Sequence, residues 1–210
     1  MLPGAHDPGR TAVVMAASGE TLSYGELDAA ANRIARLLAS MGLRPGDHIA
    51  LCLENSPRFF EVLWGAHYAG LLYTACSTRL TPEELRYVVD DCGARVVVMS
   101  PRYAELAAAI GDATPRVEHR LSAGGGIGGF EPIEDLAAGQ DPAPLPAPRI
   151  AGRDMLYSSG TTGRPKGIRP KELTAPLEEA PVIVTPVLRD RIGVGPQAVS
   201  LSPAPLYHAA

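Results

Sequence analysis

An alternation of apolar runs with capped helical stretches restricts the fold of this chain more than any other feature. The apolar runs, which we expect to be strands, are Thr11–Met15, Ile49–Leu53, Leu71–Ala75 and Val96–Met99. The helical stretches begin near Ser23, Pro57, Thr81 and Tyr103, and the last of them is expected to run to Ile110. Strands that alternate with helices require a parallel sheet covered by helices on both faces. The sequence therefore predicts an α/β fold with a mostly parallel sheet.

Local signals also mark where the helices begin and end. Ser23 and Glu26, and likewise Thr81 and Glu84, have the spacing of a capping box, in which each side chain bonds the backbone N–H of the other residue. Gly93 is expected to end the helix that begins at Thr81. In the helix that begins near Pro57, we expect four large apolar side chains to be buried: Phe59, Phe60, Leu63 and Trp64.

The stretch that indicates chemistry is residues 157–167, which read YSSGTTGRPKG. Glycines let backbone N–H groups converge on an anion, hydroxyls add neutral donors, and Lys166 supplies a mobile positive charge. The spacing is not that of the common nucleotide-binding loop, in which the lysine directly follows a glycine. An ordinary surface turn explains the composition but not the order of hydroxyls, glycines and lysine. We interpret the stretch as a polyphosphate-binding loop.

The same stretch resembles the phosphate-binding signature of the adenylate-forming enzymes, which include acyl-CoA synthetases, luciferase-like enzymes and the adenylation domains of peptide synthetases. Two weaker signatures precede it, LSYGEL at 22–27 and LRPGDHIA at 43–50, and another, PAPLYH at 203–208, comes after it in the family's order. The resemblance implies the N-terminal part of that family's large domain, truncated, with mostly parallel sheets and helices on both faces.

The resemblance also implies a reaction and a site. A carboxylic acid would react with ATP to give an acyl-adenylate, and CoA would then form the thioester. The acid is expected to be a fatty acid, and an aryl or amino-acid substrate stays open. Mg²⁺ would arrive with the nucleotide. Lys166, Thr161 and His208 are the implied catalytic residues, and Tyr207 and His208 would face the carboxylate. The implied ligands of the ATP phosphates are Ser158, Ser159, Gly160, Thr161, Thr162, Gly163, Lys166 and Gly167.

Composition divides the chain into three segments. We expect a first α/β unit at residues 1–112, a Gly/Pro-rich connector at 113–153, and a phosphate-loop segment with an incomplete second subdomain at 154–210. Gly124–Gly129 formally match a dinucleotide-binding fingerprint, but a run that is nearly all glycine does so by composition, and we interpret it as a flexible loop. A final strand is expected at Ala198–Ser202.

The overall composition narrows the functional classes. With 46% hydrophobic residues, 20% charged residues and a net charge of −4, the chain is expected to be a globular protein that does not bind nucleic acid. No apolar run approaches the roughly 20 residues of a membrane span, and no signal-peptide pattern occurs. Cys52, Cys76 and Cys92 are expected to be buried free thiols, which fits the cytoplasm, and no protein-held metal is expected. A homodimer is left open.

Two alternatives to an enzyme stay open on the sequence. The family's later motifs, for adenine, for ribose and for the lysine of the small C-terminal domain, do not occur in these residues. These residues alone are therefore expected not to form acyl-adenylate at a useful rate, and the missing C-terminal part of the same enzyme would be their partner. One alternative is a catalytically incomplete module that binds nucleotide phosphates or a partner chain. The other is a plain α/β domain whose Ser/Thr/Gly loop has no function.

Overall fold

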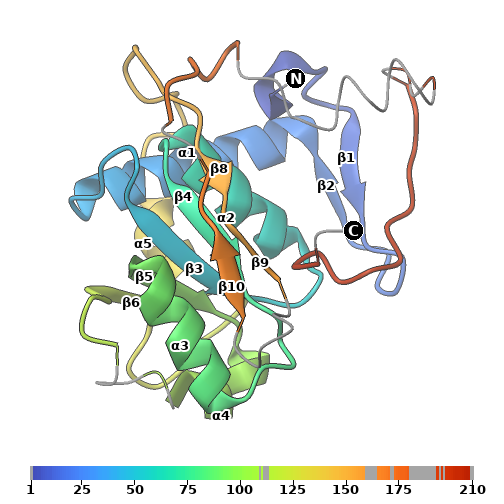
Figure 1. The fold of residues 1–210 in the computed structure, drawn as a ribbon. Helices are drawn as coiled ribbons and strands as arrows, with labels where there is room; N and C mark the ends of the chain where they lie inside the picture. Colours follow the sequence, from blue (N-terminus) through green and yellow to red (C-terminus); the bar gives the residue numbers. More distant parts are fainter. Residues whose placement is uncertain are drawn as a thin grey trace.

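A parallel six-stranded sheet forms the centre of the molecule (Figure 1). The computed structural model describes residues 2–108, 110, 114–158, 165–170, 173–179, 193, 195 and 197–208. The strands are arranged in the order β7–β6–β5–β3–β4–β8, and every neighbouring pair is parallel. Their bounds are β3 His48–Cys52, β4 Leu72–Ala75, β5 Ala94–Met99, β6 His119–Ser122, β7 Glu131–Pro132 and β8 Arg153–Asp154. The predicted α/β fold with a mostly parallel sheet is confirmed.

Two antiparallel pairs lie beside this sheet. β1 (Thr11–Val14) pairs with β2 (Thr21–Ser23), and β9 (Leu156–Ser158) pairs with β10 (Lys166–Ile168). Each of the four apolar runs predicted as strands overlaps a strand, namely β1, β3, β4 or β5. β9 directly precedes the candidate phosphate loop, and its partner β10 follows the loop.

The predicted helices are present and begin at the predicted caps. Their bounds are α1 Tyr24–Ser40, α2 Pro57–Tyr68, α3 Pro82–Cys92, α4 Ala104–Ala108 and α5 Ile133–Ala138, with short 3-10 helices η1 Pro3–Ala5 and η2 Pro101–Tyr103. Both capping boxes form, at the start of α1 and at the start of α3. Gly93 ends α3 with a φ of 72°, a left-handed conformation that favours glycine. Within the stretch predicted as a fourth helix, η2 precedes the short α4.

Alternate residues of the central strands face opposite sides of the sheet, because side chains in a strand alternate with a period of two. Ile49 and Leu51 belong to a buried cluster that includes residues of α1, α2 and α5. Ala50 and Cys52 belong to a second cluster, with residues of α3. Figure 1 shows α3 in front of the sheet and the paler α5 behind it. Burial on both faces explains why these strands are apolar throughout.

The prediction for the buried face of α2 is wrong for three of four side chains. Phe59 is buried, whereas the others are only half-buried: Phe60, Leu63 and Trp64. The buried face instead includes Val62 and Gly65. A Cβ on Gly65 would lie 2.4 Å from Cγ2 of Ile34, so α2 approaches α1 as closely as a glycine permits. That contact determines which face of α2 is buried. Phe60, Leu63 and Trp64 lie at the edge of this face and are therefore only half-buried.

The three cysteines are buried and free, as predicted. Burial raises the pKa of the Cys52 thiol and of the Cys92 thiol to about 12, and it also raises the pKa of Cys76. All three thiols are therefore protonated and unreactive near neutral pH. They pack together with α3 in the cluster on its side of the sheet.

The segment expected as a connector, residues 113–153, contributes to the central sheet. It contains β6, β7, α5 and the first residue of β8. Gly124–Gly129 lie in the loop between β6 and β7, and the backbone N–H of Gly124 donates to Glu134 Oε1 at 2.7 Å. The sheet thus extends across both proposed boundaries, at 112/113 and at 153/154, and the division into domains stays a prediction.

The final strand predicted at Ala198–Ser202 is wrong. These residues have no regular secondary structure, and the side chains of Val199 and Leu201 are 96% and 80% exposed. An apolar alternating run forms a strand only when a neighbouring strand offers backbone partners, and none pairs with it in the described part of the chain. Separately, none of the described helices combines the length and apolar character needed to cross a membrane.

Candidate nucleotide-phosphate site

The candidate phosphate loop is held at both ends by the hairpin of β9 and β10. In their antiparallel register, Ser158 pairs with Lys166, Tyr157 with Gly167, and Leu156 with Ile168. The pairing of β9 with β10 (Figure 1) brings Ser158 next to Lys166, although these residues are eight positions apart in the chain. Five of the predicted phosphate ligands lie outside the described residues, and their role stays a prediction: Ser159, Gly160, Thr161, Thr162 and Gly163.

Ser158 and Lys166 are both exposed at the base of this loop. Ser158 Oγ donates to the backbone carbonyl of Lys166 at 3.5 Å, so the hydroxyl also joins the two strands. Among the described residues, no carboxylate forms an ion pair with the ammonium group of Lys166. Because Lys166 is exposed, a solvent-borne anion can reach its ammonium group, as a lysine that binds phosphate requires.

The hairpin is tied to α3 through Tyr157. The hydroxyl of Tyr157 donates to Asp91 Oδ2 at 2.5 Å. Burial, and secondarily the bond to Asp91, raises the pKa of Tyr157, so the group stays a protonated donor. On the opposite strand, a Cβ on Gly167 would lie 2.3 Å from Met155 Cε and 2.9 Å from Tyr157 Cζ. The missing side chain at Gly167 is what lets the two strands close over the tyrosine ring.

A buried histidine is connected to the start of the hairpin by two hydrogen bonds. His48 Nε2 lies 2.8 Å from Thr74 Oγ1, and the Thr74 hydroxyl donates to the carbonyl of Met155, the residue before β9, at 3.0 Å. Because the threonine proton is used for Met155, Nε2 of His48 must be the donor in the first bond. Burial, and secondarily Arg169, lowers the pKa of His48 to about 4, so the ring is neutral. β3, β4 and the hairpin are thereby joined by one polar chain.

His48 was not predicted as part of this site. It directly precedes the run Ile49–Leu53, which is expected to be a strand, and a histidine beside apolar strand residues gives no local indication of its partner. The signal that could have found it is the polar residue that directly precedes the apolar run Ile49–Leu53, because strands of a parallel sheet are buried on both faces.

The two residues predicted to face the carboxylate lie near the end of the described chain. Tyr207 is half-buried and His208 is exposed, and the backbone N–H of His208 donates to the carbonyl of Pro205 at 3.0 Å. Within the described residues, no hydrogen bond or ion pair joins either side chain to Lys166. The structure thus brings Ser158, Lys166 and Gly167 together, and no hydrogen bond between described residues links Tyr207 or His208 to them.

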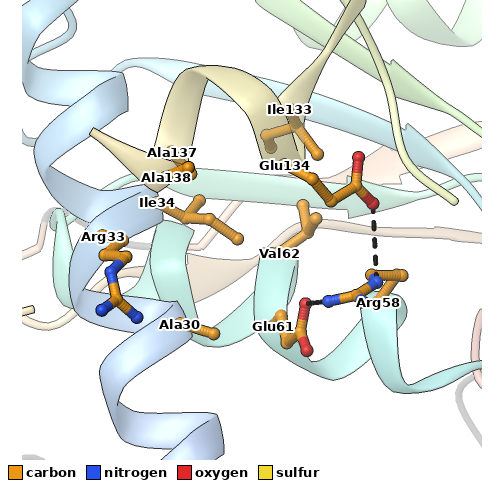
Figure 2. A pocket seen from close by; sticks show the side chains of 10 residues that line it. All are labelled: Ala30, Arg33, Ile34, Arg58, Glu61, Val62, Ile133, Glu134, Ala137 and Ala138. Carbon is orange, nitrogen blue, oxygen red and sulfur yellow. Dashed lines mark hydrogen bonds and ion pairs between the residues drawn. The ribbon is translucent and has the colours of Figure 1, made fainter. Parts of the chain in front are cut away.

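A cavity of about 380 Å³ lies away from the hairpin, between α1, α2 and α5 (Figure 2). Its apolar walls include Ile34, Val62 and Ile133. On one side, Arg58 forms ion pairs with Glu61 at 2.5 Å and with Glu134 at 3.5 Å. None of the predicted site residues that the structure describes lines this cavity. Likewise, no group of three potential metal-binding side chains occurs in the described part of the chain.

The parallel α/β sheet, and the hairpin that carries a hydroxyl-, glycine- and lysine-containing loop, agree with the resemblance to the adenylate-forming enzymes. The chain belongs to the AMP-binding enzyme family, whose sequence model matches residues 4–210. The resemblance in the sequence is confirmed at this level.

Three relatives illustrate the family. The chain is 31% identical over 192 residues to a 4-hydroxybenzoate–CoA/benzoate–CoA ligase of Rhodopseudomonas palustris, covering 90% of this chain and 34% of that protein. It is 31% identical over 150 residues to the long-chain-fatty-acid–CoA ligase FadD13 of Mycobacterium tuberculosis, covering 70% of this chain and 29% of that protein. ATP-bound MatB from Rhodopseudomonas palustris superposes with a TM-score of 0.72 at 30% identity, covering 96% and 38% of the two chains. This chain thus spans about a third of the length of the relatives it matches.

Proposed function

We propose that the chain is the N-terminal portion of an ATP-dependent acyl-CoA synthetase. The enzyme would activate a carboxylic acid as its acyl-adenylate and then form the CoA thioester. The observation that carries the proposal is the β9–β10 hairpin, which presents Lys166, unpaired among the described residues, beside Ser158 at the base of the Ser/Thr/Gly loop. The curated relatives named above, both CoA ligases, support the same class of reaction.

The proposed chemistry is dominated by charge. A carboxylate must attack the α-phosphorus of ATP, which is itself an anion, and further charge develops on the departing pyrophosphate. Donors and cations that are already in place lower the cost of this charge build-up. We propose that Lys166, the hydroxyls of Thr161 and Thr162, and the glycine N–H groups bind the β- and γ-phosphates. An ionised carboxylate needs no general base, and Mg²⁺ would enter as part of the MgATP substrate.

For the acid we propose a fatty acid, with Tyr207 and His208 facing its carboxylate. The relationship to a long-chain-fatty-acid–CoA ligase supports this choice. An aromatic acid is the second candidate, because the 4-hydroxybenzoate–CoA/benzoate–CoA ligase aligns with more of this chain. The three buried thiols, which are kept reduced in the cytoplasm, support a cytoplasmic location.

The test is ATP–pyrophosphate exchange, measured on the protein in its full natural length with fatty, benzoic and hydroxycinnamic acids. We expect exchange that depends on the acid, with kcat/KM at least about tenfold higher for a fatty acid, a difference of about 1.4 kcal/mol. Exchange that prefers an aromatic acid would replace the proposed substrate with the second candidate. Absence of exchange with every acid would contradict the proposed function. Residues 1–210 alone are expected to be inactive in the same assay, and clear exchange would refute that expectation.

A further inference from the structure

Asn55 lies where the topology of the sheet changes direction. The chain leaves β3 just before Asn55, and α2 begins two residues after it. β3 connects through α2 to β4 on one side, whereas its other neighbour, β5, connects to β6 in the opposite direction, so the two connections diverge between β3 and β5. In open parallel sheets, the crevice outside the carboxyl ends of strands at such a switch point is where ligands bind. Asn55 therefore lies at the edge of the sheet that is suited to a substrate.

The Asn55 amide binds the backbone of a segment that lies about 150 residues further along the chain. Its Nδ2 donates to the carbonyl of Ala204 at 3.1 Å, and its Oδ1 accepts from the backbone N–H of Leu206 at 2.8 Å. One planar side chain thereby bonds two backbone positions that are two residues apart, as a neighbouring strand would. The Leu206 side chain also packs against the buried cluster on the α1 and α2 side of the sheet.

These contacts fix the part of the chain that carries Tyr207 and His208. Residues 198–202 have no regular structure and are exposed, so they cannot orient the residues after them. Directly after Leu206 the backbone turns, and the N–H of His208 bonds the carbonyl of Pro205. The two side chains proposed to face the carboxylate therefore extend from a short turn whose start is held by Asn55.

We propose that Asn55 is a positioning residue for the carboxylic-acid substrate: through its two hydrogen bonds it holds the turn from Pro205 to His208 at the carboxyl edge of the sheet. Asn55 itself does not touch the reacting atoms in this proposal. The inference rests on the proposed function, because it gives Tyr207 and His208 their substrate-facing role. The placement of the turn, however, can be measured without any catalysis.

The first measurement is hydrogen exchange at the Leu206 amide, in the protein at its full natural length. We expect Asn55→Ala to accelerate this exchange about tenfold or more, since a typical hydrogen bond of this kind is lost. Amides of the central strand β5 should keep their protection. Ser56→Ala is the matched control, because the neighbouring hydroxyl makes no cap hydrogen bond, and it should leave Leu206 unchanged. Unchanged exchange at Leu206 in Asn55→Ala would overturn the proposal.

The second measurement is the kinetics of pyrophosphate exchange. We expect Asn55→Ala to raise KM for the acid about tenfold, with a smaller effect on kcat and none on KM for ATP, and Ser56→Ala to match the wild type. A purely structural loss would lower the active fraction and leave both KM values unchanged, and that result would overturn the positioning role. If the wild type shows no pyrophosphate exchange with any acid, the proposed function fails and the positioning role fails with it. This holds even if Asn55→Ala accelerates hydrogen exchange at the Leu206 amide.

Asn55→Asp covers the case in which the alanine variant does not fold. The aspartate keeps an acceptor for the Leu206 N–H but has no donor for the Ala204 carbonyl. We expect at least a threefold rise in KM for the acid, about half the free energy of the alanine effect, with an unchanged melting temperature. Kinetics equal to those of the wild type would overturn the proposal.

Discussion

Lys166 is the residue on which the proposed binding of ATP depends most directly. It is exposed beside Ser158, and its charge is unpaired among the described residues. In the protein at its full natural length, Lys166→Ala should lower kcat/KM for ATP roughly 100-fold, the size of effect seen when one preorganised transition-state donor is removed. Lys166→Arg should retain part of the activity, because the charge is kept but the geometry differs.

The control for this prediction is Arg44→Ala. Arg44 is an exposed cation in the turn before β3, at the amino end of the sheet, so its removal changes the net charge by the same amount. Pyrophosphate exchange at several ATP concentrations measures both variants. Normal ATP consumption by Lys166→Ala, or an equal loss in Arg44→Ala, would contradict the assignment.

The Tyr157 hydroxyl tests how firmly one residue anchors the hairpin. Tyr157→Phe removes the bond to Asp91 without changing the ring that packs on Gly167. We expect the free energy of unfolding to fall by about 1 kcal/mol. Urea denaturation of Tyr157→Phe, Asp91→Asn and the double variant would measure the coupling between the two side chains. Strictly additive effects would show that the bond contributes nothing to stability.

At the scale of elements, the close approach of β9 and β10 depends on Gly167. In Gly167→Ala the new methyl would meet Met155 and Tyr157 well inside contact distance. We expect the free energy of unfolding to fall by about 1–3 kcal/mol, which is typical of overpacking. We also expect the rate of pyrophosphate exchange to fall, because β9 and β10 hold the two ends of the candidate phosphate loop. Gly128→Ala is the control, since a Cβ there meets nothing within 4 Å. Wild-type exchange in Gly167→Ala would refute the dependence of the hairpin on this glycine.

Elements with local signals could be predicted from the sequence, and elements defined by their neighbours could not. The capping boxes at Ser23 and Thr81 mark two helix starts correctly, because both partners lie within one turn. β7 and β8 have two residues each and exist only through pairing with β6 and β4. The strand expected at Ala198–Ser202 fails for the converse reason: its apolar pattern is suitable, but it has no described partner.

The same distinction holds for the site across the whole molecule. The order of hydroxyls, glycines and Lys166 is local, and it indicated the loop and the family, although residues 159–164 of the loop lie outside the described part of the chain. The supports of the site are not local. Asn55 bonds a segment about 150 residues away, and His48 reaches Met155 through Thr74. Such contacts become visible only when the fold is known.

The neutral, buried His48 makes the stability of the folded protein depend on pH in a predictable way. Burial lowers its pKa from 6.5 in the unfolded chain to about 4. Between these values the unfolded state binds more protons than the folded state, so stability rises with pH there. The contribution is fully present above pH 6.5 and is lost as pH falls to about 4, amounting to at most about 3 kcal/mol.

Urea denaturation between pH 4 and 7 measures this contribution. His48→Gln keeps a donor for Thr74 but cannot titrate, so we expect a shallower decline in stability below pH 6.5 than in the wild type. Some decline should persist, because burial also lowers the pKa of His67. His119→Gln, at the start of β6, is the matched control for the loss of a histidine side chain elsewhere in the sheet. Identical slopes for the wild type and His48→Gln would mean that His48 binds protons equally in the folded and unfolded states, and the lowered pKa assigned to the buried ring would be wrong.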